Sequence, residues 1–322
     1  MKALFCILAV LLMAVVAEAR QKTITIGEFS FDSQPDLLAL YGVADIHAFN
    51  RTTFGGTGWS DTNALPESST WYDEVAAALT GAGGGSHDWC DAGQVTYFDH
   101  ESWRVEAADG SAARQATAHK WYVLGTELKA RLPNCTLGFY GYLGSNGVKD
   151  DFTRATSPVG SANYTFWQSM NNDLAEIWAA PWDWIMPTFY FSFTRAADGP
   201  TNVVLYNTYY NAVMDEYDRM KATYGHGQKI IPFIWQRKRN NSAFVDMDVW
   251  RAQICIAYLR GDGFSWFTLT GTAWSDTAEY WIHLKKVLED PNPCGHFEST
   301  RSAASTRSAA STRSAAPSRS AR

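Results

Sequence analysis

Apolar segments with a strand pattern alternate with helical patterns along most of the chain. Seven segments rich in apolar, β-branched and aromatic residues predict strands at 23–31, 43–49, 94–99, 136–142, 184–191, 229–235 and 263–269. Six segments with helical spacing predict helices at 69–79, 112–131, 166–180, 203–224, 247–260 and 277–289. Several strand segments are apolar on both faces, which is typical of a parallel sheet covered on both sides. The alternation predicts an α/β architecture with right-handed crossovers.

Two α/β architectures fit such a pattern, a doubly wound open sheet and a closed barrel. The first predicted strand is not followed by a GxGxxG turn, and the chain holds no P-loop motif. The number of strand–helix units favours a (β/α) barrel, TIM-like with some distortion, built from seven or eight strands. Its functional residues are then expected at the C-terminal ends of the strands.

The two ends of the chain differ from this body. Residues 1–19 combine Lys2, an uninterrupted apolar run at 3–17 and a small-x-small site at 17–19, the pattern of a cleaved secretory signal. The apolar run is shorter than the roughly 20 residues that span a bilayer, so we expect no membrane span after cleavage. Residues 299–322 repeat Ser-Thr-Arg-Ser-Ala-Ala and hold no large apolar residue, which predicts a disordered tail. The barrel domain is therefore expected at 20–298.

The cysteines agree with a secreted, extracellular protein. Loss of Cys6 with the signal leaves Cys90, Cys135, Cys255 and Cys294, which can pair in three ways. None of the four has the spacing of a zinc site, so we expect neither a metal nor another cofactor. Four Asn-x-Ser/Thr sequons, which begin at 50, 134, 163 and 240, fit an exported glycoprotein.

Charge and aromatic content narrow the class of ligand. Residues 20–298 include 32 acidic and 21 basic side chains. This excess of negative charge argues against nucleic acid as a partner. Aromatic residues make up 14% of the chain and include 14 Trp. Aromatic rings stack on the apolar faces of flat ligands and sugars, although a large core also uses them.

The sharpest candidate for chemistry is a pair of acids after the third predicted strand. Asp99 and Glu101 are two residues apart, so an extended chain places both carboxylates on one side, with Cα atoms roughly 6–7 Å apart. Two neighbouring carboxylates repel each other, and one keeps its proton to higher pH, as a general acid requires. His100 then points away from them. The alternative is that both are ordinary loop acids, capping the next helix or pairing with Arg104.

Aromatic residues stand at the ends of four other predicted strands. These residues are Tyr140, Tyr190, Trp235 and Trp266. Each ring alone is compatible with core packing. Their recurrence at one end of successive strands is the arrangement that a saccharide cleft requires.

The segment Asp99-x-Glu101-x-Trp103-Arg104 resembles the Asp-x-Glu-x-Trp-Arg signature of hyaluronidases. Weaker resemblances occur at 138–141, 187–190, 231–233 and 263–266, the last with its Trp about one residue out of register. The resemblance implies a secreted, distorted (β/α) barrel that acts on a polysaccharide. The sequence departs from the signature at His100 and Val105 and in its cysteine spacing. We therefore expect a chitin-like or other N-acetyl-hexosamine polymer as readily as hyaluronan.

The resemblance also implies a role for each site residue. Glu101 is the general acid/base of a retaining, substrate-assisted glycosidase, and Asp99 orients the acetamide of the substrate, which attacks the anomeric carbon. Tyr140 and Tyr190 would hold the N-acetyl group, and Arg104 would support the acids or the substrate. Trp235 and Trp266 remain candidate stacking platforms.

Two other functions fit parts of the sequence. A non-catalytic, extracellular carbohydrate-binding or cell-coat protein on the same barrel is favoured by the Arg/Ser/Ala tail, for which an enzyme has no need. A metal-dependent hydrolase on a barrel is the third hypothesis for the function. It is disfavoured because the sequence holds no cluster of His and Asp with metal-ligand spacing.

Overall fold

The computed structural model describes residues 23–26, 40–49, 65, 69–81, 89–90, 94–99, 103, 109–141, 148–189, 203–236, 243–267, 274–290 and 294. The chain separates into two compact units, Met1–Ser275 and Asp276–Arg322. The predicted signal at 1–19 and the predicted tail at 299–322 lie outside the described residues. None of the described helices is both long enough and apolar enough to cross a bilayer.

Eight strand segments form one sheet in which every neighbouring pair is parallel. The segments are β1 (Thr23–Ile26), β2 (Ala44–Phe49), β3 (Val95–Phe98), β4 (Thr136–Tyr140), β5 (Trp184–Met186), β6 (Lys229–Ile230), β7 (Phe233–Trp235) and β8 (Gly263–Phe267). Their order in the sheet is β6-β5-β4-β3-β2-β1-β8-β7. The predicted parallel α/β architecture is confirmed.

The sheet closes on itself, because β6 and β7 are two parts of one strand. Pro232 separates them, and proline has no N–H to donate to a neighbouring strand. On one side, the Phe233 amide donates to the Pro187 carbonyl just beyond β5 (2.7 Å). On the other side, the Ser265 amide of β8 donates to the Pro232 carbonyl (2.8 Å). The two ends of the strand order therefore meet, and the described strands form a (β/α) barrel with seven strand positions, within the predicted seven or eight.

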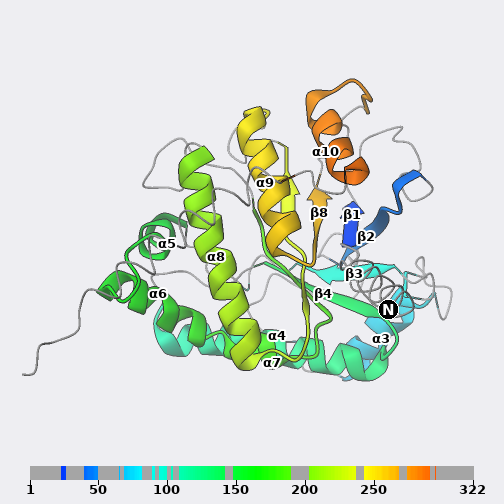
Figure 1. Ribbon diagram of the computed structural model, residues 1–322. Coiled ribbons are helices and arrows are strands. Elements are labelled where there is room, and N and C mark those ends of the chain that lie inside the picture. The colour runs from blue at the N-terminus through cyan, green and yellow to red at the C-terminus, as the bar shows by residue number, and fades with distance from the viewer. Residues whose placement is uncertain are drawn as a thin grey trace, which may run out of the picture. The chain divides into compact units, whose positions relative to one another are not determined.

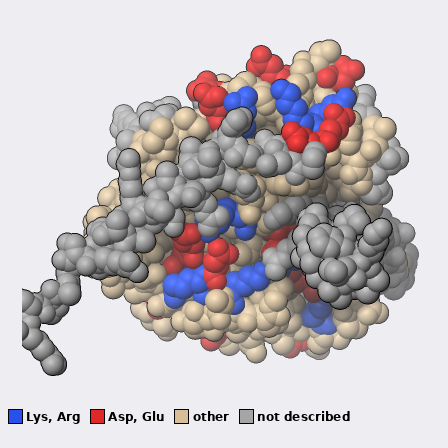
Figure 2. All heavy atoms as spheres, viewed as in Figure 1, with Lys and Arg blue, Asp and Glu red and all other residues tan. Residues whose placement is uncertain are grey.

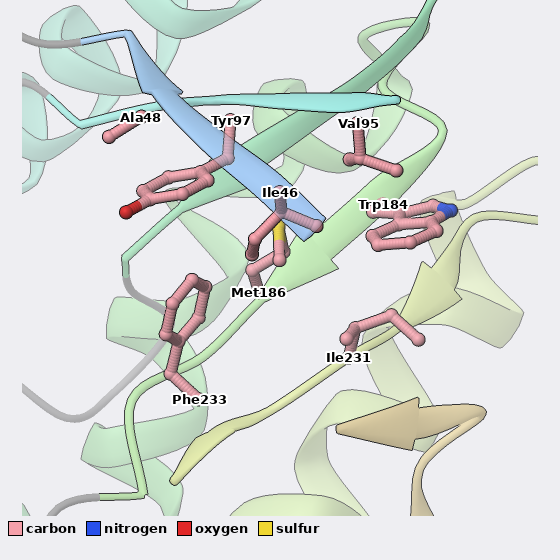
Figure 3. Packing of buried hydrophobic residues seen from close by; sticks show 8 residues of the cluster. All are labelled: Ile46, Ala48, Val95, Tyr97, Trp184, Met186, Ile231 and Phe233. Atoms are coloured by element: carbon pink, nitrogen blue, oxygen red, sulfur yellow. The ribbon is translucent and has the colours of Figure 1, made fainter. Parts of the chain in front are cut away.

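Alternate residues of the strands fill the barrel interior. Figure 3 shows the buried cluster, whose side chains point toward one another from the strands: Ile46, Ala48, Val95, Tyr97, Trp184, Met186, Ile231 and Phe233. Gly138 of β4 belongs to the same wall, and a Cβ there would lie 2.6 Å from the Met186 sulfur. The cluster is a packed core and positions the residues that follow it on each strand.

Helices follow the strands in sequence, and those of the first compact unit lie outside the sheet (Figure 1). They are α3 (Ser69–Leu79), α4 (Ser111–Arg131), α5 (Val148–Ala155), α6 (Ala162–Asn172), α7 (Ala175–Ala179), α8 (Val203–Tyr224), α9 (Met247–Arg260) and α10 (Glu279–Glu289). Helix α4 packs beside α7, and α8 packs beside α9. Helix α10 belongs to the second compact unit.

Two local predictions were wrong. The helix predicted at 166–180 is two helices, α6 and α7, and α5 precedes them where no helix was predicted. The break falls at Asp173, whose carboxylate accepts hydrogen bonds from Ser111 (2.6 Å) and from Arg114 (2.8 Å) of α4. The two preceding side chains bind α8, Asn171 to Glu216 (3.0 Å) and Asn172 to Arg219 (2.8 Å), so neighbouring helices hold the whole Asn-Asn-Asp run where α6 ends.

An acid at the start of β5 joins three elements at the N-terminal rim of the barrel. The Asp183 carboxylate accepts the Leu137 amide of β4 (2.8 Å) and the Lys129 ammonium of α4 (2.7 Å). The Asp183 amide donates in turn to the Leu137 carbonyl (2.9 Å). One side chain thus fixes the register of two strands and the end of the preceding helix.

The same device recurs at the start of β8. The Asp262 carboxylate accepts the Ile230 amide of β6 (2.9 Å) and the Lys221 ammonium of α8 (3.2 Å). The Asp262 amide donates to the Ile230 carbonyl (2.8 Å). Two strand–helix units of the barrel therefore use the same Asp–Lys–amide contact at this rim.

Disulfide bonds hold four of the described cysteines. Cys90 pairs with Cys135, with their Cα atoms 4.9 Å apart, just before β3 and β4 begin. Cys255 and Cys294 are disulfide-bonded as well. The pairing that the sequence left open is thus settled for Cys90 and Cys135, and the predicted disulfides are confirmed.

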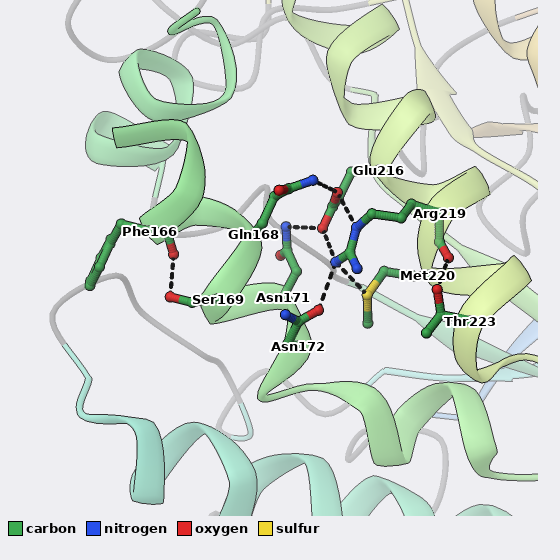
Figure 4. A network of polar contacts seen from close by, with 9 residues as sticks. All are labelled: Phe166, Gln168, Ser169, Asn171, Asn172, Glu216, Arg219, Met220 and Thr223. Atoms are coloured by element: carbon green, nitrogen blue, oxygen red, sulfur yellow. Dashed lines mark hydrogen bonds and ion pairs between the residues drawn. The ribbon is translucent and has the colours of Figure 1, made fainter. Parts of the chain in front are cut away.

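A buried carboxylate joins α6 to α8 (Figure 4). Glu216 is 2% exposed and receives four hydrogen bonds. Two come from Gln168 (3.3 Å) and Asn171 (3.0 Å) of α6, and two from the Arg219 guanidinium (2.6 and 2.8 Å). The hydrogen bond to Glu216 raises the pKa of Arg219. Because every oxygen of Glu216 is satisfied, we assign this network to helix packing.

Candidate active site

Four of the seven predicted site residues lie within the described part of the chain. These are Asp99, Tyr140, Trp235 and Trp266. Glu101, Arg104 and Tyr190 lie outside the described residues.

Asp99 directly follows β3 and is half-buried. Val95 and Tyr97 of β3 both point into the barrel (Figure 3). Because side chains alternate along an extended chain, the position of Asp99 belongs to the same side as Tyr97. All strands are parallel, so Asp99 stands at the C-terminal edge of the barrel, where functional residues of this architecture gather.

Three aromatic rings meet just below this edge. The Tyr97 ring lies 5.4 Å from that of Tyr140 and 5.1 Å from that of Phe233, and Tyr140 lies 4.9 Å from Phe233 edge-on, all between centroids. Tyr97 and Phe233 are buried, whereas Tyr140 is partly exposed. Tyr140 therefore lies with Tyr97 and Phe233, on the interior side to which the position of Asp99 belongs.

Sequence reasoning did not single out Tyr97 or Phe233. Tyr97 carries a usable signal, because it stands two residues before Asp99 on a strand and must share its side. Phe233 has no comparable signal in the sequence. It follows the Pro232 interruption, and its place depends on how the barrel closes.

Trp235 ends β7 two residues beyond Phe233 and is 6% exposed. Its amide donates to the side-chain oxygen of Gln253 on α9 (3.1 Å). The C-terminal end of this strand is thereby tied to the helix that covers it.

Trp266 lies in a different layer from the aromatic trio. Its ladder partner on β1 is Ile26, whereas the preceding Ser265 pairs with Phe233 of the interior cluster. Trp266 is fully buried, lies 6.5 Å from the ring of Trp250 on α9 and donates its indole N–H to Gln236 (2.9 Å). A shift of one residue along a strand reverses the face, so Trp266 packs between sheet and helix.

Trp103, the tryptophan of the Asp-x-Glu-x-Trp-Arg segment, packs on α4. Its ring meets that of Trp121 edge-on at 5.1 Å, and the Lys120 ammonium lies 5.8 Å from its centroid. Burial lowers the pKa of Lys120. The Trp121 indole donates to the Trp103 carbonyl (3.4 Å). These contacts anchor the segment at Trp103, between the positions of Glu101 and Arg104.

Charges on the described surface are mixed in sign. Over α8, acidic and basic side chains lie next to one another (Figure 2). Arg260 of α9 pairs there with Asp215 (2.7 Å) and Asp218 (2.9 Å). Among the described residues, no group of three or more His, Cys, Asp and Glu side chains is arranged to hold a metal ion.

Comparison with known proteins gives distant structural matches. No protein-family model and no curated protein matches the chain. A solved structure of bee venom hyaluronidase matches with 13% identity and a TM-score of 0.39, over 62% of this chain and 70% of that one. A second, in complex with a hyaluronic acid tetramer, matches with 12% identity and a TM-score of 0.37, over 84% and 85%. Because both TM-scores are below 0.5, our fold assignment rests on the strand order and hydrogen bonds of this chain.

Proposed function

We propose that this chain is a secreted glycoside hydrolase that cleaves a polysaccharide containing N-acetyl-hexosamine by a retaining, substrate-assisted mechanism. The observation that carries the proposal is the place of Asp99. Asp99 follows a barrel strand at its C-terminal edge, two residues after Tyr97, whose ring lies 5.4 Å from that of the partly exposed Tyr140.

The proposed chemistry uses two carboxylates that differ in task. Glu101 donates a proton to the glycosidic oxygen as the bond from that oxygen to the anomeric carbon breaks. The acetamide oxygen of the substrate attacks the anomeric carbon from the opposite face, and Asp99 accepts a hydrogen bond from the acetamide N–H. Water, deprotonated by Glu101, then opens the cyclic intermediate and restores the acetamide, so the anomeric configuration is retained.

The remaining residues would bind the sugar. Tyr140 and Tyr190 hold the N-acetyl group, and Arg104 supports the acids or the substrate. Trp235 stands at the end of the adjoining strand and supplies apolar surface, which stacks on sugar C–H faces. We leave Trp266 out of the proposed site because it packs against α9.

Export through a cleaved signal belongs to the same proposal. The disulfide bond between Cys90 and Cys135 supports it, because such bonds persist in oxidising compartments. N-terminal sequencing of the protein recovered from medium should begin at Arg20. Retention of residues 1–19 in the recovered protein would contradict the export proposal.

The test of function is the Glu101→Gln variant, assayed for reducing ends released from hyaluronan, chondroitin and N-acetyl-chitooligosaccharides. General acid/base catalysis contributes about 10²–10⁴-fold, so a loss of that size is expected. The matched control is Glu176→Gln, a half-exposed acid on α7 that pairs with His119 and should keep full activity. Unchanged turnover in Glu101→Gln would remove Glu101 from the mechanism.

A non-catalytic carbohydrate-binding protein on the same barrel is the second outcome of this assay. Asp99 at the barrel edge suits binding as well as cleavage, because a carboxylate accepts hydrogen bonds from sugar hydroxyls. Binding of a glycan by the wild-type protein without release of reducing ends would favour it.

A further inference from the structure

Two small hydroxyl side chains stand in the barrel wall beside the mainly apolar interior cluster. Thr25 of β1 and Ser265 of β8 are both fully buried. No described residue supplies a hydrogen-bond partner to the hydroxyl of either. A buried hydroxyl without a partner costs free energy, and buried polar groups in proteins almost always have one.

The register places both hydroxyls on the interior side. Ser265 pairs with Phe233, a member of the interior cluster. Thr25 pairs with Ser265 on one side and with Ala44 on the other, and Ala44 stands two residues before the interior Ile46. Paired residues of parallel strands point to the same face, so Thr25 and Ser265 lie side by side inside the barrel.

The spacing suits a single bridging oxygen. Neighbouring strands lie about 4.8 Å apart. Two hydrogen bonds of about 2.8 Å that meet at a tetrahedral oxygen join atoms about 4.6 Å apart. An oxygen bound between the two hydroxyls would therefore satisfy both, and two polar partners are the minimum that a buried water needs.

We propose that Thr25 and Ser265 form a binding site inside the barrel for one hydroxyl oxygen that both donates and accepts a hydrogen bond. Water and a sugar hydroxyl share this chemistry. The site lies one strand from Phe233, which contacts Tyr97 and Tyr140. Occupation by a sugar hydroxyl rests on the proposed function, whereas occupation by water does not.

The first test measures thermal unfolding of Thr25→Val, which keeps the shape of the side chain and removes its hydroxyl. Loss of bonds to a bound oxygen should lower Tm by about 2 °C. Ser265→Ala should lower Tm as well. Because both hydroxyls bind the same oxygen, the double variant should lose less than the sum of the two single losses.

Thr96→Val is the matched control. Thr96 is 1% exposed, and its hydroxyl also has no described partner. Its ladder neighbours are His47 and Leu137, so no second hydroxyl stands beside it to share an oxygen. The Tm of the Thr96→Val variant should equal that of the wild-type protein or exceed it. If Thr25→Val also leaves Tm unchanged or raises it, Thr25 and Ser265 do not form the proposed site.

The second test distinguishes the two sources of the oxygen by calorimetric titration with chitotetraose and with a hyaluronan tetrasaccharide. A loss of affinity of about five- to tenfold in Thr25→Val and Ser265→Ala, but not in Thr96→Val, identifies a sugar hydroxyl at the site. Unchanged affinity with lowered Tm identifies water. If the wild-type protein binds neither glycan, the proposed function fails, and the Tm comparison still decides whether the site exists.

Discussion

Glu216 shows what one buried carboxylate contributes to this molecule. It is surrounded by Gln168, Asn171 and the two-pronged guanidinium of Arg219 (Figure 4). A charge without its partner is costly in such surroundings, whereas an exposed ion pair contributes little.

We predict that Glu216→Gln lowers the free energy of unfolding by about 2 kcal/mol. Fully buried pairs lose about 3–5 kcal/mol when one partner is removed, and the Arg219 side chain, 31% exposed, recovers part of this from water. Urea denaturation measures the change. Asp218→Asn, which removes a half-exposed partner of Arg260, should change stability by less than about 1 kcal/mol. Equal effects in the two variants would contradict the assignment of Glu216 to packing.

We predict that the protein loses stability at alkaline pH because Tyr206 is buried. It is fully buried, it donates to the Phe189 carbonyl (2.7 Å), and burial raises its pKa well above 10. Above pH 10 the unfolded chain loses this proton while the folded chain keeps it. The stabilisation present below pH 10 is therefore lost as pH rises, by up to about 1.4 kcal/mol per pH unit. Tyr206→Phe should show a shallower decline in urea midpoints above pH 10, and an unchanged slope would refute this prediction.

At single positions, the sequence predicts a side chain's face only when the register is known. Tyr140 was expected near the acids and lies beside Tyr97. Trp266 was expected there too, but it stands one residue from the interior position of Ser265 and faces α9. Composition and motif cannot separate these two cases, because period-two alternation changes the face with each residue.

At the scale of elements, the rim contacts of Asp183 and Asp262 predict a specific loss of stability. Asp183→Ala leaves the Leu137 amide and the Lys129 ammonium without their shared acceptor, which should lower the free energy of unfolding by about 1–3 kcal/mol. Asp183→Asn keeps one acceptor and should recover part of that loss. Chemical denaturation of both variants checks this order, and equal stability of Asp183→Ala and wild type would contradict it.

Helix α4 offers a case in which two known effects oppose each other. Replacing Gly125 by Ala in a helix interior normally stabilises by about 1 kcal/mol. Here a Cβ would lie 2.8 Å from the Trp182 ring, and overpacking costs about 1–3 kcal/mol. We predict that Gly125→Ala lowers Tm. A raised Tm would contradict this prediction and would show that the Trp182 ring moves aside at little cost.

The elements were predictable where one pattern extended without interruption. The bounds of α3, α8 and α9 agree with the predicted segments, because each ends at a clear change in polarity or at Gly. The sixth strand was predicted as continuous and is split at Pro232, and the α6–α7 break depends on Asp173 finding Arg114. Tertiary contacts of this kind are not visible in a local pattern.

For the whole molecule, the closed parallel barrel followed from the alternation of strands and helices, and the position of Asp99 followed from the barrel. The ring cluster could not be predicted in this way, because Phe233 lies 136 residues after Tyr97, on the strand that closes the barrel. Asp99 at the C-terminal edge, two residues after Tyr97 of this cluster, is the arrangement on which the proposed binding of a sugar rests.

The most direct measurement compares initial rates of reducing-end release from N-acetylated and N-deacetylated chitotetraose, for wild type and Asp99→Asn. If the substrate's acetamide is the nucleophile and Asp99 orients it, wild type should cleave the acetylated oligomer at least about 100-fold faster, and Asp99→Asn should lose most of that preference. Equal rates on the two oligomers would contradict the account.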